Sequence, residues 1–144
     1  MTVGRTGAGK STLGLALLRA VPTLGRTLFD GREAERTNLD SLRSAISIIP
    51  QIPELLEGTL RENLDPFNEC DDAELNMALR ATGLMRYTDK DSDKSQEFGL
   101  DTHVDNSGAN FSQGQRQIIA LTRALIRRTK LLIMDEATSA IGVF

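Results

Sequence analysis

A glycine-rich segment near the start of the chain restricts its fold more than any other feature. It runs from Gly4 to Ser11 and reads Gly-Arg-Thr-Gly-Ala-Gly-Lys-Ser. Glycines let the backbone curl so that successive N–H groups point inward, which creates a site for phosphate oxygens. Residues 10–21 are rich in Leu and Ala and are predicted to form a helix, whose positive dipole end would face that site. The alternative is a glycine turn that only precedes a helix.

An apolar run followed by two acids forms the second informative segment. Residues 131–134 are continuously apolar, which predicts a parallel strand buried on both faces. Because ligands bind at the carboxyl ends of such strands, Asp135 is expected to face the glycine-rich segment. One carboxylate can hold Mg²⁺ through its water shell, and Glu136 can polarise an attacking water as a general base. The alternative is a strand that ends in solvent, where acids are common.

Two further segments place polar groups at the ends of elements. Ser112 and Gln115 form a Ser-x-x-Gln box at the start of a helix predicted over residues 112–128. Together with Gly114 the helix start can also bind an anion, although capping alone would explain the pattern. Gln51 follows a strand predicted over residues 45–49, and its amide can bridge Mg²⁺ and the attacking water. An exposed glutamine without function is the default interpretation.

The remaining pattern predicts the fold class. A strand at 26–29 leads into an Asp-Gly turn, and a helix at 71–82 begins at the capping residue Asp71 and ends at Gly83. Strands that alternate with helices indicate an α/β fold. Residues 88–97 carry mixed charges and no apolar side chain, which predicts a solvated loop.

Composition restricts the partners and the cellular environment. A chain of 144 residues suggests one domain, and its net charge of −3 does not favour binding of nucleic acid. No apolar run approaches the roughly 20 residues that a membrane helix needs. The lone Cys70 has no internal disulfide partner, which fits a reducing compartment. Its acidic neighbours are expected to raise the pKa of the thiol, so a reactive cysteine is not expected.

Together these segments resemble the nucleotide-binding domain of an ABC transporter. The glycine-rich segment resembles Walker A, Gln51 the Q-loop, residues 111–115 the signature and residues 131–136 Walker B. The match extends between the motifs and looks like the second nucleotide-binding domain of the C subfamily, the multidrug-resistance-associated proteins. The segments that carry this closer resemblance are residues 42–43, 48–51, 58–67, 112–117 and 135–139.

This resemblance implies a fold and a set of site residues. The fold is a P-loop NTPase with a RecA-like α/β core (residues 1–53 and 128–144) and an inserted, mostly helical ABC subdomain (residues 54–127). ATP and Mg²⁺ are the implied ligands, with Glu136 and Gln51 as catalytic residues. The implied nucleotide-binding residues are Gly4, Arg5, Thr6, Gly7, Ala8, Gly9, Lys10, Ser11 and Thr12. The residues implied to hold Mg²⁺ are Ser11, Gln51 and Asp135. The implied signature residues, which would act on a partner's ATP, are Ser112, Gln113, Gly114 and Gln115.

The resemblance also implies partners and a location. Two such domains would sandwich two ATP molecules head to tail, and their closure would move attached transmembrane domains to export a substrate. The expected partners are therefore a second nucleotide-binding domain and the transmembrane domains, without nucleic acid. The expected location is the cytosolic face of a membrane, within an integral membrane transporter.

The sequence departs from the family pattern at several places. Phe111 and Gln113 replace Leu and Gly in the signature, and Gly142 stands where the D-loop carries Asp. The switch histidine and the aromatic residue that stacks on adenine would lie outside the chain. The chain is therefore expected to be a fragment, incomplete at both ends, and unstable and inactive when expressed alone. The alternatives are a phosphate-binding remnant without turnover and a soluble ABC ATPase, although residues 58–67 look like transporter sequence.

Overall fold

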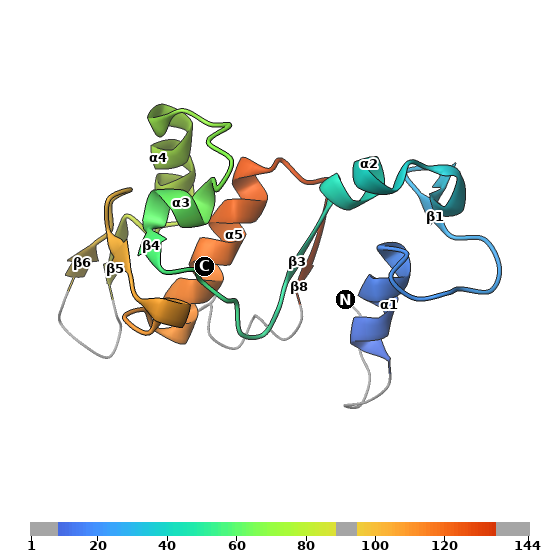
Figure 1. The fold of residues 1–144 in the computed structure, drawn as a ribbon, viewed down its shortest axis with the longest axis horizontal. Helices are drawn as coiled ribbons and strands as arrows, with labels where there is room; N and C mark the ends of the chain where they lie inside the picture. The colour runs from blue at the N-terminus through green and yellow to red at the C-terminus, as the bar shows by residue number, and fades with distance from the viewer. Residues whose placement is uncertain (1–8, 89–94, 135–144) are drawn as a thin grey trace.

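The computed structural model describes residues 9–88 and 95–134, and Figure 1 shows their arrangement. The helices are α1 (Lys10–Leu17), α2 (Leu39–Ser44), α3 (Leu60–Leu64), α4 (Asp72–Ala81) and α5 (Gln113–Ile126), with short 3-10 helices at Ala34–Arg36 and Asn106–Gly108. The strands are β1 (Leu28–Phe29), β2 (Arg32–Glu33), β3 (Ile46–Ile49), β4 (Gly58–Thr59), β5 (Arg86–Thr88), β6 (Ser95–Glu97), β7 (His103–Val104) and β8 (Leu131–Met134). The mixture of helices and strands is consistent with the predicted α/β class.

Strands β3 and β8 form a parallel pair near the middle of the molecule (Figure 1). Ile46 lies opposite Leu131, and Ile49 lies opposite Met134. Both strands were predicted from their apolar runs, and both predictions are confirmed. The expected burial of β8 on both faces is wrong, because Met134 is 46% exposed and the rest of the strand is only half-buried. Among the described residues β8 has β3 as its only strand neighbour, so part of its surface stays uncovered.

Helix α1 packs against this parallel pair. A Cβ atom built on Gly14 would lie 3.5 Å from a methyl group of Ile133 and 3.7 Å from one of Ile48, which is ordinary van der Waals contact. The helix ends at Leu17, before the predicted end at Val21. The reason is Arg19, which has a positive φ of 54° and donates hydrogen bonds to backbone carbonyls near residue 34.

The hairpin of β1 and β2 follows the predicted Asp-Gly turn. Asp30 and Gly31 have φ values of 53° and 73°, as a two-residue type I′ hairpin turn requires. Lys130, close to the start of β8, forms an ion pair of 2.7 Å with Asp30. The hairpin is therefore tied to the sequence that leads into β8.

Helices α3, α4 and α5 pack together in the other part of the molecule (Figure 1). Leu75 and Leu79 of α4 lie four residues apart, on one face of the helix, and both are fully buried. On α5, Leu125 is 48% exposed, whereas Ile119 is fully buried. Helix α5 contacts α3, α4 and β3.

The buried apolar side chains form two separate clusters. The large cluster fills the space between α3, α4 and α5, and the small cluster lies beneath α2 and beside β3. The large cluster contains Leu55, Leu60, Leu64, Leu75, Leu79, Leu84, Phe98, Val104, Phe111, Ile118 and Ile119. The small cluster contains Ala34, Leu42 and Ile46, with Leu17, Leu18, Phe29, Leu131 and Ile133 packed around it.

The predicted solvated loop at residues 88–97 is wrong at its edges. Residues 95–97 form β6, which pairs in antiparallel fashion with β5. Strand pairing satisfies backbone N–H and C=O groups whatever the polarity of the side chains, so a purely polar sequence does not exclude a ladder. The middle of this segment, residues 89–94, lies outside the described residues.

Candidate functional site

The first turn of α1 stands where the sequence places phosphate binding. Gly9 precedes the helix in the left-handed region, with φ 78° and ψ 17°, and no described side chain caps the helix start. The first N–H groups of a helix have no partner within the helix, and such groups can bind an anion. Lys10 and Ser11 occupy the first positions of α1, and Thr12 follows with an exposed side chain.

The start of α1 and the ends of β3 and β8 lie on one side of the molecule (Figure 1). Figure 1 shows the N-terminal end of α1 at the same end as the carboxyl ends of the parallel strands β3 and β8. The contact of Gly14 with Ile48 and Ile133 fixes the helix against these strands. Ligands of α/β proteins bind at such an edge. The described elements therefore fit a phosphate group beside α1.

Several predicted site residues lie outside the described residues. They are Gly4, Arg5, Thr6, Gly7, Ala8, Asp135 and Glu136. Within the described part, no group of three or more His, Cys, Asp and Glu side chains is placed to hold a metal ion. The residues predicted to hold Mg²⁺ would not form such a cluster. They would offer the hydroxyl of Ser11, the amide of Gln51 and the carboxylate of Asp135. Oxygen donors of this kind suit Mg²⁺, which keeps several of its waters.

Gln51 lies directly after the Ile46–Ile49 strand and Pro50, with its side chain exposed. Its backbone carbonyl accepts hydrogen bonds from the side-chain amides of Gln113 at 3.4 Å and Gln117 at 3.1 Å. The structure thus brings the predicted Q-loop residue against the helix that begins with the predicted signature. It does not bring the signature to α1, because Figure 1 shows the starts of α1 and α5 far apart.

Gln117 is a residue that sequence reasoning missed. Its side chain is fully buried, although glutamine is rarely found in a core. It lies one helical turn after Gln113, so both amides reach the same side of α5. The repeated Gln at this spacing was the available signal, but its partner is 66 positions away in the sequence.

A capping box begins α5. The N–H of Gln115 donates to the Ser112 hydroxyl at 3.2 Å, and the N–H of Ser112 donates to the Gln115 side chain at 2.8 Å. Gln115 and Gly114 are buried, whereas Ser112 and Gln113 are exposed. The capping role predicted for Ser112 is confirmed, and its role toward a nucleotide stays a prediction.

A second link joins α5 to the segment that follows Gln51. The Arg123 guanidinium donates to the Asn63 carbonyl at 2.6 Å, to the Asn63 side chain at 2.8 Å and to the Glu54 carbonyl at 3.1 Å. Asn63 in turn exchanges two hydrogen bonds with the backbone of Leu56. Burial lowers the pKa of Arg123, and the nearby charge of Arg127 acts in the same direction.

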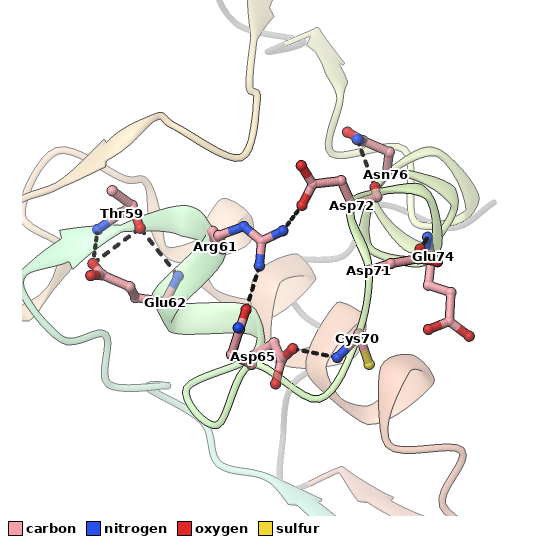
Figure 2. A network of polar contacts seen from close by, with 10 residues as sticks. Thr59, Arg61, Glu62, Asp65, Cys70, Asp71, Asp72, Glu74 and Asn76 are labelled. Carbon is pink, nitrogen blue, oxygen red and sulfur yellow. Dashed lines mark hydrogen bonds and ion pairs between the residues drawn. The ribbon is translucent and has the colours of Figure 1, made fainter.

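A polar network between α3 and α4 orients these helices (Figure 2). Arg61 forms an ion pair with Asp72 at the start of α4, and the N–H of Cys70 donates to Asp65 at 2.7 Å. Burial raises the pKa of Asp65, but hydrogen bonds from the N–H groups of Cys70 and Glu69 and the charge of Arg61 outweigh it and lower that pKa.

The pKa of the Cys70 thiol is raised, as predicted from its acidic neighbours. Burial raises the pKa of its thiol, and the charges of Asp65, Glu74 and Glu69 raise it further. The thiol is therefore less ionised at neutral pH than an exposed cysteine.

Comparison with known proteins places the chain in a family. A family model described as ABC transporter matches residues 1–139, and the chain belongs to this family. Membership implies a P-loop NTPase fold, and domains of this family bind ATP, typically with Mg²⁺.

Curated relatives of the chain are named as transporters. The chain is 51% identical to ATP-binding cassette transporter abc4 of Schizosaccharomyces pombe, over 96% of the chain and 10% of the relative. It is 49% identical to ABC transporter C family member 12 of Dictyostelium discoideum, over 96% of the chain and 10% of that protein. It is 47% identical to ABC-type transporter cicA of Emericella nidulans, over 96% of the chain and 11% of that protein. The chain thus spans about a tenth of the length of these relatives. No helix in the part of the chain that the structure describes has the length and apolarity to cross a membrane.

Proposed function

We propose that this chain is a nucleotide-binding domain of an ABC transporter of the C subfamily, where it binds and hydrolyses Mg-ATP to drive substrate export. The observation that carries the proposal is that the start of α1, which no described side chain caps, lies on the same side of the molecule as the carboxyl ends of β3 and β8, where Gln51 follows β3. The similarity to transporters named as C family members supports it.

The site residues divide the chemistry among three segments. Gly4 to Thr12 bind the triphosphate through backbone N–H groups and Lys10. Ser11, Gln51 and Asp135 hold the magnesium ion, which draws negative charge from the phosphates. Glu136 accepts the proton of the attacking water. The side chain of Gln51 is exposed beside the end of β3, which is consistent with a role in binding Mg²⁺.

The two apolar clusters support a division into two subdomains. The large cluster draws only on residues between 55 and 119, which lie inside the proposed helical subdomain of residues 54–127. The small cluster and the parallel strands belong to the proposed core of residues 1–53 and 128–144. The helical subdomain would carry the surface that meets the transmembrane domains on the cytosolic face.

A second nucleotide-binding domain is the proposed partner. The start of α5, with Ser112 to Gln115, lies far from the start of α1 in the same chain (Figure 1). A signature in this position acts on the nucleotide of a facing domain, so that two domains in head-to-tail arrangement enclose two ATP molecules. The partner domain completes the site that this chain begins.

Substitution of the proposed base tests this function. In the full-length protein, Glu136→Gln keeps the shape of the side chain but removes the proton acceptor. We expect nucleotide affinity to persist while steady-state phosphate release falls by about 10²–10⁴-fold. Unchanged turnover would assign the base to another residue. A wild-type protein that binds Mg-ATP without turnover would instead identify a phosphate-binding remnant.

A further inference from the structure

Helices α5 and α3 hold the segment that follows β3 at three points. Gln117 donates to the carbonyl of Gln51, Arg123 donates to the carbonyl of Glu54, and Asn63 accepts from the N–H of Leu56 at 2.9 Å. The two contacts from α5 join residues that lie 66 and 69 positions apart in the sequence. The position of Gln51 therefore depends on α5 as well as on the strand that precedes it.

The side-chain amide of Gln117 is held in one orientation by its hydrogen bond to the Gln51 carbonyl. It is fully buried, and its oxygen is buried without a hydrogen-bond donor among the described residues. The amide cannot turn over, because its oxygen would then face the carbonyl oxygen of Gln51. Buried polar atoms in folded proteins nearly always have partners. An apolar side chain would pack here without an unpaired oxygen, so core packing does not explain the glutamine.

We propose that Gln117 is a positioning residue for Gln51, an inference that rests on the proposed function. Gln117 acts through the backbone carbonyl and keeps the Gln51 side chain where it can meet Mg²⁺ and the attacking water. Gln113, at the signature, reaches the same carbonyl from one turn earlier. Movement of the start of α5 therefore changes the position of Gln51, which links the signature to this chain's own magnesium site.

The variant Gln117→Met tests the contact, because methionine has similar length and no N–H donor. The measurements use the full-length protein and comprise hydrogen exchange of peptides covering residues 50–56, phosphate release with Mg-ATP, and thermal unfolding. We expect faster exchange in residues 50–56 and a fall in kcat of about ten- to hundredfold, as for residues that orient metal ligands. The KM for ATP stays close to wild type, because the phosphate-binding loop is untouched. The unfolding temperature does not fall, since the unpaired oxygen is removed as well.

Thr122→Val is the matched control on the same helix. Thr122 is fully buried, and its hydroxyl shares a hydrogen bond of 2.9 Å with the hydroxyl of Thr82, the residue that follows α4. Its described hydrogen bonds, to Thr82 and to the Ile118 carbonyl, do not involve residues 51–56. We expect this variant to lower the unfolding temperature while exchange in residues 50–56 and kcat remain unchanged.

A double-mutant cycle tests whether Gln117 acts through Gln51. Gln51→Ala removes the side chain but keeps the carbonyl, so adding Gln117→Met to it should cause no further loss of turnover. Fully additive losses would overturn the positioning role. Gln117→Leu serves as a second apolar replacement, and if both replacements unfold at lower temperature than Thr122→Val, the amide is structural and the proposal is wrong.

The remaining outcomes separate this inference from the proposed function. Unchanged exchange in residues 50–56, or unchanged kcat, in Gln117→Met alongside an active wild type would overturn the inference alone. A wild-type protein that neither binds nor hydrolyses Mg-ATP would overturn the proposed function and the positioning role together. Exchange would still show whether Gln117 holds the segment.

Discussion

Asp65 shows how one carboxylate organises a turn between two helices. Its side chain is only 8% exposed and accepts the N–H of Cys70, while Arg61 bridges from α3 to Asp72 (Figure 2). The ionised form is favoured, so the pKa of Asp65 lies below its ordinary value of 3.8. As the pH falls, the carboxylate of Asp65 is therefore protonated at a higher pH in the unfolded chain than in the folded protein. The stabilisation is complete above the ordinary pKa and is lost as the pH falls through the lowered one.

Asp65→Asn is therefore expected to change the pH dependence of stability. The amide oxygen can still accept the N–H of Cys70, but it carries no charge to titrate. We expect the variant to be less stable than wild type at pH 7, with a difference that shrinks toward pH 3. Urea unfolding at both pH values measures this. The control Asp101→Asn removes an exposed carboxylate for which no hydrogen bond is described. An equal loss of stability at pH 7 and pH 3 would contradict the assignment.

Single residues were predictable where their partners are local. The effect of acidic neighbours on the Cys70 thiol and the caps at Asp71 and Ser112 follow from side chains a few positions apart. Gln117 was not predictable, because its buried side-chain amide donates to the backbone carbonyl of Gln51, 66 positions away in the sequence. No local pattern identifies such a partner.

Helix starts are the best-determined features at the scale of elements. In α4 and α5 the capping side chain and the N–H that it accepts are three residues apart, so the sequence alone contains the contact. Helix α1 ends early because Arg19 reaches the distant carbonyls of Ala34 and Thr37. The ladder of β5 and β6 likewise depends on pairing that polar side chains do not reveal.

The cap of α5 gives a prediction for element stability. Ser112→Ala removes the hydroxyl that accepts the Gln115 N–H and is expected to destabilise the protein by about 1 kcal/mol. Ser112→Thr keeps a hydroxyl and should retain most of the stability. Both are compared by urea unfolding without nucleotide, so that any role in a partner's ATP site does not contribute. Equal stability of Ser112→Ala and wild type would show that the cap seen here contributes nothing.

At the scale of the whole molecule, the two apolar clusters differ greatly in size. The large cluster joins α3, α4 and α5, whereas the small one has three buried members among the residues that the structure describes. The sequence predicted strands and helices in both regions but not this division, which came only from the family resemblance. Backbone hydrogen bonds from Lys130 and Leu131 to the Ala45 carbonyl connect the chain after α5 to the start of β3. The strength of such connections decides whether the clusters unfold together.

We expect the small cluster to open without the large one. Leu42 and Ile119 are both almost fully buried, at 1% and 0% exposure, and truncation of either to alanine typically costs about 2–5 kcal/mol. Leu42→Ala should speed hydrogen exchange in α2 and β3 while α4 and α5 stay protected, because few other buried side chains among the described residues support its cluster. Ile119→Ala should speed exchange throughout α3, α4 and α5, which share one core. Hydrogen exchange read by peptide compares the two variants. Equal acceleration in α4 and α5 by Leu42→Ala would mean that the clusters form one cooperative unit, and the proposed division into subdomains would lose its energetic basis.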